Sequence, residues 1–181
     1  MVEPSTMRAP PSGAAALVSV GLVPPAARFS FRGGEDAAET CGRAFGLALP
    51  RDACRAAEAQ GRAALWLGPD EWLLMAPDGD GPTVRAALEA ALAGVPQALV
   101  DVSHRQVGFV VGGARAASLV NAGCPLDLDP AAFPVGMCAR TVLGKCDVTL
   151  WRRGPELFRV EVNRSFADYL AGYLRVAERG L

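Results

Sequence analysis

The chain has 181 residues, of which 51% are hydrophobic and 20% are charged, with 18 basic and 19 acidic side chains. This length allows one domain, or two small subdomains, with a real core, and the composition excludes a disordered protein. The net charge of −1, without any cluster of Lys or Arg, excludes generic nucleic-acid binding through phosphate neutralisation.

Residues 1–25 are predicted to form an N-terminal arm, because five prolines interrupt them. The apolar stretch 14–23 is about as long as the core of a signal peptide, but it lacks a basic segment before it and a clean cleavage site after it. Two alternatives remain open for the arm: it packs on a neighbouring subunit, or it is a frayed tail. No apolar run is long enough to predict a transmembrane helix.

Eight strands are predicted in residues 26–181, near 27–32, 63–67, 72–76, 97–102, 106–111, 138–143, 146–152 and 156–162. Four helices are predicted near 35–46, 82–93, 113–122 and 166–178. The last helix has the clearest pattern, with an apolar stripe from Phe166 to Ala177, Ser165 as its expected N-cap and Asp168 at the third position.

An internal repeat divides this body. The segment 29–38 (FSFRGGEDAA) is similar to 109–117 (FVVGGARAA), and 65–74 (LWLGPDEWLL) is similar to 150–159 (LWRRGPELFR). The first half has the order β-α-β-β-α-β of a ferredoxin-like unit, and the second half repeats most of it. The sequence therefore predicts an α+β fold of duplicated ferredoxin-like units, with subdomains 26–104 and 105–181.

The residue types that bind metals or carry redox chemistry are sparse. His104 is the single histidine, which excludes a site built from several His ligands. No two cysteines have the CxxC spacing of zinc ribbons, thioredoxin-like proteins or iron–sulfur proteins. We expect reduced thiols, most of them buried as small hydrophobic side chains. The five cysteines are Cys41, Cys54, Cys124, Cys138 and Cys146.

Two glycine pairs, Gly33-Gly34 and Gly112-Gly113, are candidates for a phosphate-binding turn at a helix N-terminus. Neither pair belongs to a dinucleotide-binding fingerprint or a P-loop. The favoured interpretation is a tight strand-to-helix turn that needs a positive φ.

The densest polar cluster is 101–106 (DVSHRQ). Asp101, Ser103 and His104 are too close in sequence, on one short segment, for a nucleophilic triad. The alternatives are a bend in which Asp101 and Ser103 accept local N–H groups, or a contact of His104 with a partner or ligand.

Other candidate residues are isolated. Asp147 is a lone carboxylate at the start of a strand, which is weak evidence for acid–base chemistry. Arg164 can pair with an acidic residue of a partner or stay solvated. Trp66, Trp72 and Trp151 lie on the two predicted hairpins, where they serve as core residues or as interface anchors.

Six segments resemble the gamma subunit of heterotetrameric sarcosine oxidase. They are 67–74 (LGPDEWLL), 100–106 (VDVSHRQ), 122–130 (AGCPLDLDP), 139–141 (ART), 150–152 (LWR) and 160–168 (VEVNRSFAD). The resemblance runs from about residue 26 to the C-terminus. Asp101 to His104 also resembles a motif of the glycine-cleavage aminomethyltransferase, or T-protein, family. Asp147 falls on an acidic position of that family, although 143–146 (LGKC) departs from its Gly-Gly pattern, so Asp147 is the only folate candidate.

The resemblance implies a non-catalytic gamma subunit, with no catalytic residue, cofactor or metal on this chain. It also implies a cytoplasmic complex with alpha, beta and delta subunits, which oxidatively demethylates sarcosine to glycine, releases hydrogen peroxide and passes the one-carbon unit to tetrahydrofolate. FAD, FMN, NAD, tetrahydrofolate and zinc would lie on the partners, and the alpha subunit would be the direct contact. The interface candidates are Asp101, Ser103, His104, Arg105, Trp66, Trp72 and Arg164.

Three alternatives remain for the function. The chain could be a free-standing folate-binding or one-carbon-transfer domain, a small regulatory module, or a gamma-like subunit of an N-methylglutamate dehydrogenase.

Overall fold

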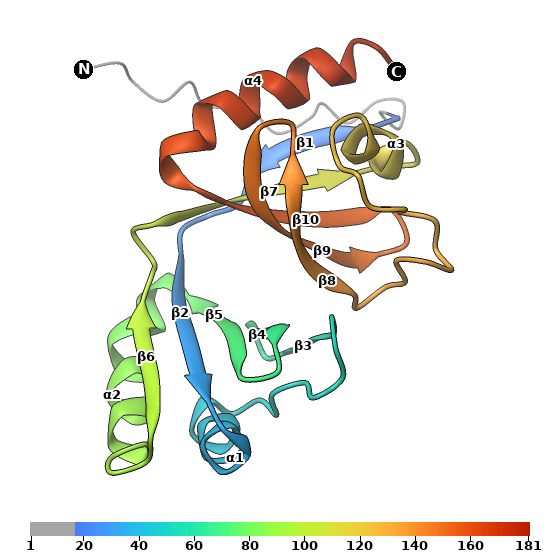
Figure 1. The fold of residues 1–181 in the computed structure, drawn as a ribbon. Helices are drawn as coiled ribbons and strands as arrows, with labels where there is room; N and C mark the ends of the chain where they lie inside the picture. The colour runs from blue at the N-terminus through green and yellow to red at the C-terminus, as the bar shows by residue number, and fades with distance from the viewer. Residues whose placement is uncertain (1–16) are drawn as a thin grey trace, which may run out of the picture.

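The computed structural model describes residues 17–181, which form two five-stranded antiparallel sheets with two helices on the outer side of each sheet (Figure 1). The first sheet has the strand order β3-β4-β5-β2-β6, and the second has the order β1-β7-β10-β9-β8. Within residues 17–181, no helix has the length and apolar character needed to cross a membrane.

The first sheet contains β2 (Ala26–Gly33), β3 (Ala56–Ala59), β4 (Arg62–Gly68), β5 (Glu71–Pro77) and β6 (Gln97–Asp101). Helices α1 (Glu35–Phe45) and α2 (Gly81–Ala91) cover it, with a 3₁₀ turn, η1 (Asp78–Asp80), before α2.

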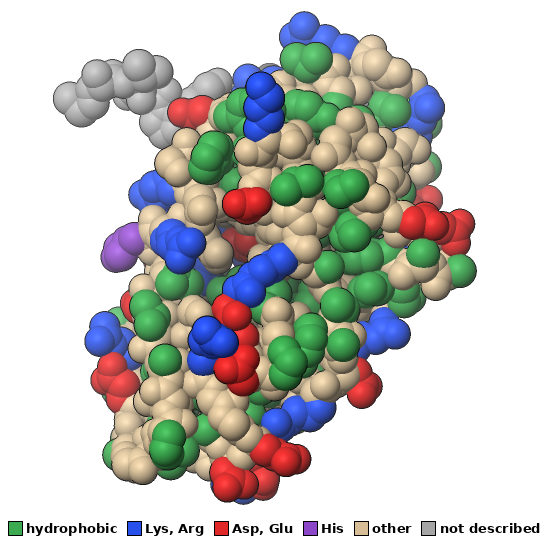
Figure 2. Space-filling view, viewed as in Figure 1, with side chains coloured by type: hydrophobic (Ala, Val, Ile, Leu, Met, Phe, Trp, Pro, Cys, Tyr) green, Lys and Arg blue, Asp and Glu red, His purple; other side chains and the backbone are tan. Residues whose placement is uncertain are grey.

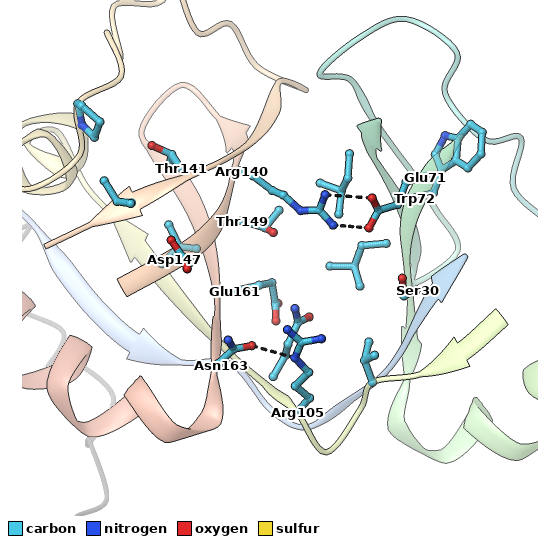
Figure 3. Close-up of a pocket in the computed structure, with 17 residues that line it drawn as sticks. Ser30, Glu71, Trp72, Arg105, Arg140, Thr141, Asp147, Thr149, Glu161 and Asn163 are labelled. Atoms are coloured by element: carbon cyan, nitrogen blue, oxygen red, sulfur yellow. Dashed lines mark hydrogen bonds and ion pairs between the residues drawn. The ribbon is translucent and has the colours of Figure 1, made fainter. Parts of the chain in front are cut away.

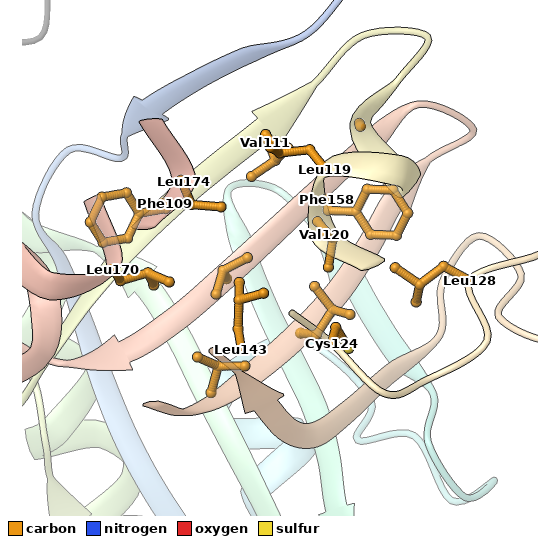
Figure 4. Packing of buried hydrophobic residues seen from close by; sticks show 14 of the residues in the cluster. Phe109, Val111, Leu119, Val120, Cys124, Leu128, Leu143, Phe158, Leu170 and Leu174 are labelled. Atoms are coloured by element: carbon orange, nitrogen blue, oxygen red, sulfur yellow. The ribbon is translucent and has the colours of Figure 1, made fainter. Parts of the chain in front are cut away.

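The second sheet contains β1 (Ser19–Leu22), β7 (Gln106–Gly112), β8 (Cys138–Leu143), β9 (Cys146–Gly154) and β10 (Leu157–Asn163). Helices α3 (Ala116–Asn121) and α4 (Ala167–Glu178) cover it, with a 3₁₀ turn, η2 (Arg164–Phe166), before α4. Figure 4 shows the core between this sheet and its helices, where Phe109 of β7 lies near Leu170 and Leu174 of α4, and Val111 lies near Leu119 of α3.

All eight predicted strands and four predicted helices are confirmed, with most ends shifted by one or two residues. Two strands were not predicted. The sequence of β3 is rich in Ala, which has little preference for strands. The second, β1, lies inside the predicted arm and pairs with β7 at the edge of the second sheet. Residues 1–16 lie outside the described residues, so the docking of the arm on a neighbouring subunit stays a prediction.

Two local predictions were wrong in part. Ser165 does not cap α4, because the chain first makes the η2 turn and Phe166 takes the N-cap position without a side-chain hydrogen bond. The glycine turn with positive φ occurs only at Gly113, where φ is 110° and a Cβ would lie 2.7 Å from the Leu17 carbonyl oxygen. Gly34 has a φ of −68°. Its neighbour Gly33 instead allows close packing, since a Cβ there would lie 2.8 Å from that of Ala37.

Cysteine burial follows the prediction for four of the five thiols. All five are free; Cys41, Cys124, Cys138 and Cys146 are buried, and Cys54 is half-buried. Burial raises the pKa of Cys41 and of Cys138 to about 12, so neither is a reactive thiolate at neutral pH.

Apolar and polar side chains alternate along β10, so this strand contributes to the core on one face and to a polar surface on the other. Phe158, Val160 and Val162 are buried in the core beneath the helices. The residues between them, Arg159 and Glu161, therefore point to the opposite face, toward the first sheet. The inner faces of the two sheets meet in a smaller apolar cluster of Ala63, Leu65, Leu73, Met75, Cys138 and Trp151. Beside this cluster the sheets separate.

Candidate functional site

A cleft of about 690 Å³ lies between the two sheets (Figure 3). This volume is within the range of small-molecule sites. The first sheet contributes Ser30, Leu67, Glu71, Trp72 and Leu73, the segment between the sheets contributes Val102 and Arg105, and β7 of the second sheet contributes Gln106. The second sheet and a nearby loop contribute Pro125, Arg140, Thr141, Val142, Asp147, Val148, Thr149, Glu161 and Asn163.

The strand register of the second sheet arranges these side chains in two rows. In the inner row, Thr149 of β9 pairs with Arg140 on one side and Glu161 on the other. In the outer row, at the mouth, Val142 pairs with Asp147, and Asn163 pairs with Gln106. Since Val162 pairs with Val148, Asn163 lies next to Asp147.

A buried ion triad joins the two sheets at the inner wall of the cleft. Glu161 is 2% exposed and accepts hydrogen bonds from Arg28 Nε of β2 at 2.7 Å and from Arg159 Nε at 2.6 Å. Gly108 faces this carboxylate, and a Cβ there would lie 2.8 Å from Glu161 Oε1. Two arginines around one carboxylate make this cluster dependent on Glu161 for charge balance.

Two more ion pairs connect the sheets near the surface. Arg140 of β8 donates two hydrogen bonds to the Glu71 carboxylate of β5, across the cleft (Figure 3). Figure 2 shows acidic and basic side chains lying against one another near the middle of this face. Arg153 of β9 pairs with Glu58 of β3. The hydrogen bond from Arg140 is the main cause that lowers the pKa of Glu71 from its ordinary value of 4.5.

The Arg140–Glu71 pair predicts a specific acid sensitivity. Because the folded state lowers the pKa of Glu71, its stabilising effect is present above the ordinary value of 4.5 and is lost as pH falls through the folded-state value. We expect Glu71→Gln to reduce the slope of unfolding free energy against pH on the acid side, with little change of slope near neutrality. Urea unfolding at several pH values between neutral and acidic measures this slope. The control is Glu39→Gln, which removes the exposed ion pair with Arg43 within α1. Equal acid slopes in the parent and Glu71→Gln would contradict the prediction.

The predicted bend at 101–106 is confirmed. The Ser103 backbone N–H donates to Asp101 Oδ1 at 2.9 Å, and Ser103 Oγ accepts from the Arg28 backbone N–H at 2.9 Å. The bonds from Ser103 hold the pKa of Asp101 below its ordinary value. Ser103 is thus engaged with the backbone of β2, and His104 is exposed beside it.

The bend also leads into the cleft. Arg105 Nε donates to Asn163 Oδ1 at 3.2 Å, and the Arg105 carbonyl accepts from the Arg164 backbone N–H at 2.8 Å. Arg105 and Asp147 line the cleft, while His104 and Arg164 are exposed residues whose backbones lie next to Arg105.

The tryptophans lie apart from that surface. Trp72 is 1% exposed, and its Nε1 donates to the Pro50 carbonyl oxygen at 2.8 Å, so it is a core residue and cannot be a partner's anchor in this conformation. Trp151 is also buried. Trp66 is half-buried and pairs with Trp72 across β4 and β5.

The sequence interpretation missed Arg28, Glu71, Arg140, Thr149 and Glu161. The available signal was the alternation of polar and apolar residues in β10, which marks a polar inner face. Among residues 17–181, no three His, Cys, Asp or Glu side chains form a group that could hold a metal ion.

The two-sheet architecture defines a fold class shared with an aminomethyltransferase. Aminomethyltransferase T of the glycine cleavage system from Bartonella henselae superposes on 88% of this chain and 46% of its own, with a TM-score of 0.69 and 16% identity. At 16% sequence identity, this structural similarity shows a shared fold and nothing about function. It confirms an α+β body of the T-protein type.

A family match gives the narrower assignment. The model described as "Sarcosine oxidase, gamma subunit family" matches residues 33–179. A gamma subunit of sarcosine oxidase from Arthrobacter sp is 36% identical over 132 residues, which are 72% of this chain and 64% of that protein. A second from Corynebacterium sp. strain P-1 is 35% identical over the same shares. The chain belongs to the sarcosine oxidase gamma subunit family, and the match spans somewhat less than two thirds of these relatives.

A solved structure supports the same assignment. A chain of the heterotetrameric sarcosine oxidase from Corynebacterium sp. U-96, in complex with pyrrole 2-carboxylate, has a TM-score of 0.86 and 28% identity. The superposition covers 93% of this chain and 87% of that chain.

Proposed function

We propose that this chain is a non-catalytic gamma subunit of a heterotetrameric complex that oxidatively demethylates sarcosine to glycine. The observation that carries the proposal is the likeness to a chain of a heterotetrameric sarcosine oxidase over 93% of this chain. The charges inside the cleft support a structural role, because Glu71, Arg140 and Glu161 are engaged in ion pairs that join the two sheets.

The partners follow from this proposal. An alpha-like subunit would be the direct contact, with beta and delta subunits completing the complex. FAD, FMN, NAD, tetrahydrofolate and zinc would be bound by those partners. A cytoplasmic location stays a prediction.

The contact surface is proposed at the mouth of the cleft. Arg105 lines the cleft, and Asp101, His104 and Arg164 are exposed residues of the same bend and of the η2 turn bonded to it. Ser103 fixes the bend through its hydrogen bond with the Arg28 backbone N–H. Trp66 is a second candidate, since it is half-buried on β4. Trp72 is buried and does not belong to this surface.

We infer a duplication within the body. The strands β4-β5-β2-β6 and β9-β10-β7-β1 occupy equivalent places in the two sheets, and the first set follows the ferredoxin-like order. In the second set, β1 from the N-terminal end of the chain takes the fourth place. The units 26–104 and 105–181 are therefore proposed as subdomains, with β1 added to the second.

A free-standing folate-binding or one-carbon-transfer domain is the second candidate. The T-protein-like fold and the exposed Asp147 at the cleft favour it. A gamma-like subunit of an N-methylglutamate dehydrogenase differs from the first proposal only in the substrate of the complex.

Co-expression of the tagged chain with an alpha-like subunit tests the first proposal. We expect a stable complex to co-purify, and the full set of subunits to release peroxide when sarcosine is added. Replacing Arg164 with Glu should lower the recovery of the partner, whereas Arg175→Glu, at an exposed position of α4, should not. A stable monomer without co-purification, binding tetrahydrofolate instead, would favour the second candidate.

A further inference from the structure

The outermost strand of the first sheet, β6, has one edge that pairs with no other strand of residues 17–181 (Figure 1). Its other edge pairs with β2 in a register without a bulge. The strand has the sequence QALVD, which contains neither a basic residue nor a proline, and its Val100 is 54% exposed. Proteins usually protect a free edge with Lys, Pro or a bulge, so an edge without them is a site for pairing with another strand.

The register shows which backbone groups of β6 face the free edge. The Val102 N–H donates to the Arg28 carbonyl oxygen at 2.8 Å, and hydrogen-bonded pairs alternate along an antiparallel ladder. Counting back from Val102, the backbone groups of Val100 and Ala98 therefore bond to β2. The N–H and C=O groups of the residues between them point away from β2, toward the free edge. These residues are Gln97, Leu99 and Asp101.

Two copies of β6 are complementary when they pair antiparallel about Leu99. In this register Leu99 lies opposite Leu99 of the second copy, and Gln97 lies opposite Asp101 of the second copy. Every outward-facing residue of both strands then exchanges its N–H and its C=O with the residue opposite. An axis moved by one residue, to Ala98 or Val100, would leave one outward-facing residue of each copy without a partner in the strand.

The side chains also match in this register. Each Asp101 carboxylate lies opposite a Gln97 amide, which can donate a hydrogen bond to it, so no like charges meet. On the other face of the sheet, each Val100 lies opposite an Ala98, and the pairing covers the exposed Val100 side chain. The edge therefore fits its own sequence in both its backbone and its side chains.

We propose that the free edge of β6 is an interface for a second copy of this chain, in which the two first sheets join into one continuous sheet about a two-fold axis at Leu99. Such an interface is isologous and closes at a dimer. A strand of five residues is about 17 Å long, so the contact is smaller than a standard protein interface, and we expect a Kd on the order of 100 µM. The contact uses only this chain, so it is independent of the proposed assembly with other subunits.

Sedimentation velocity of the full chain, in the presence of a thiol reductant, measures the association. We expect a reversible monomer–dimer equilibrium between about 10 µM and about 1 mM chain. Amide hydrogen exchange gives a local readout. The amides of Gln97, Leu99 and Asp101 should exchange more slowly at high concentration, whereas those of Ala98 and Val100, already bonded to β2, should not change.

Position 97 offers two variants with opposite expected effects. Gln97→Glu places a carboxylate opposite Asp101 and should raise the Kd by about threefold or more, since the contact occurs twice in the dimer. Gln97→Lys places an ammonium group there and should lower the Kd by about the same factor. Gln97 is exposed, so neither variant disturbs the core of the chain.

A second pair of variants tests the strand itself. Val100→Lys puts a charge on the free edge and should raise the Kd by about tenfold or more. Val135→Lys, which changes a valine that is 50% exposed in the turn before β8, should dimerise like the parent. Far-UV circular dichroism verifies that each variant is folded. The proposal is overturned if the chain stays monomeric at about 1 mM, or if a dimer forms with the same Kd in the parent, Gln97→Glu, Gln97→Lys and Val100→Lys.

Discussion

Replacing Glu161 with Gln is expected to lower the free energy of unfolding by about 3–5 kcal/mol, because it leaves two buried arginines without a carboxylate. The Arg159 Nη2 atom is already buried without a hydrogen-bond partner among residues 17–181. The loss of Glu161 would therefore remove the one group that offsets both charges. Urea unfolding, followed by tryptophan fluorescence, measures the change.

The control is Glu58→Gln, which removes the carboxylate of the partly exposed pair with Arg153. That variant should lose no more than about 1 kcal/mol, since surface ion pairs contribute little. Similar losses of unfolding free energy in Glu161→Gln and Glu58→Gln would contradict the prediction that the buried triad contributes more than a surface ion pair.

A second variant, Gly108→Ala, should also lower the free energy of unfolding, by about 1–3 kcal/mol, because its Cβ would lie 2.8 Å from Glu161 Oε1.

Deleting residues 1–25 is expected to destabilise the second sheet by at least about 3 kcal/mol. The deletion removes β1, its pairing with β7, and the buried side chain of Val18. It also breaks the hydrogen bond from the Arg115 backbone N–H to the Leu17 carbonyl oxygen. Deleting only residues 1–16 leaves all of these contacts in place.

Comparing the deletion of residues 1–25 with that of residues 1–16 distinguishes an effect on the stability of the chain from an effect on assembly with partners. If the arm binds a partner, deletion of 1–16 should lower complex yield without changing the unfolding free energy of the chain alone. Hydrogen exchange of β7 amides offers a local readout, since only the longer deletion should expose them. Equal stability of the two deletion variants would contradict the structural role of β1.

The sequence allowed most elements to be predicted, because residues 26–181 carry clear periodic patterns. The alternation in β10 and the apolar stripe of α4 are local features that a strand or helix imposes on its own residues. The bend at Asp101 and Ser103 could also be predicted, since these residue types accept neighbouring N–H groups.

The cleft could not be predicted, because its residues come together only through the pairing of distant strands. Arg28 and Glu161 are 133 positions apart, and Arg140 and Glu71 are 69 apart. Nor does the sequence indicate that Arg152 is buried, where it donates to the Leu128, Phe133 and Pro155 carbonyl oxygens. Arg28 and Arg152 would be expected at the surface from sequence alone, and only the tertiary structure supplies the acceptors that allow their burial.

The position of β1 has a consequence for the order in which the molecule folds. Ser19 meets Gly112 across 93 positions of chain, so the first strand to be synthesised is needed by a sheet whose other strands emerge much later. The first sheet, by contrast, is complete once β6 has emerged. Contacts between such distant positions form slowly, because the intervening chain must be ordered before they are gained. During synthesis the first sheet can thus form before β1 has a partner, and the second sheet is complete only after β7, β8, β9 and β10 have emerged.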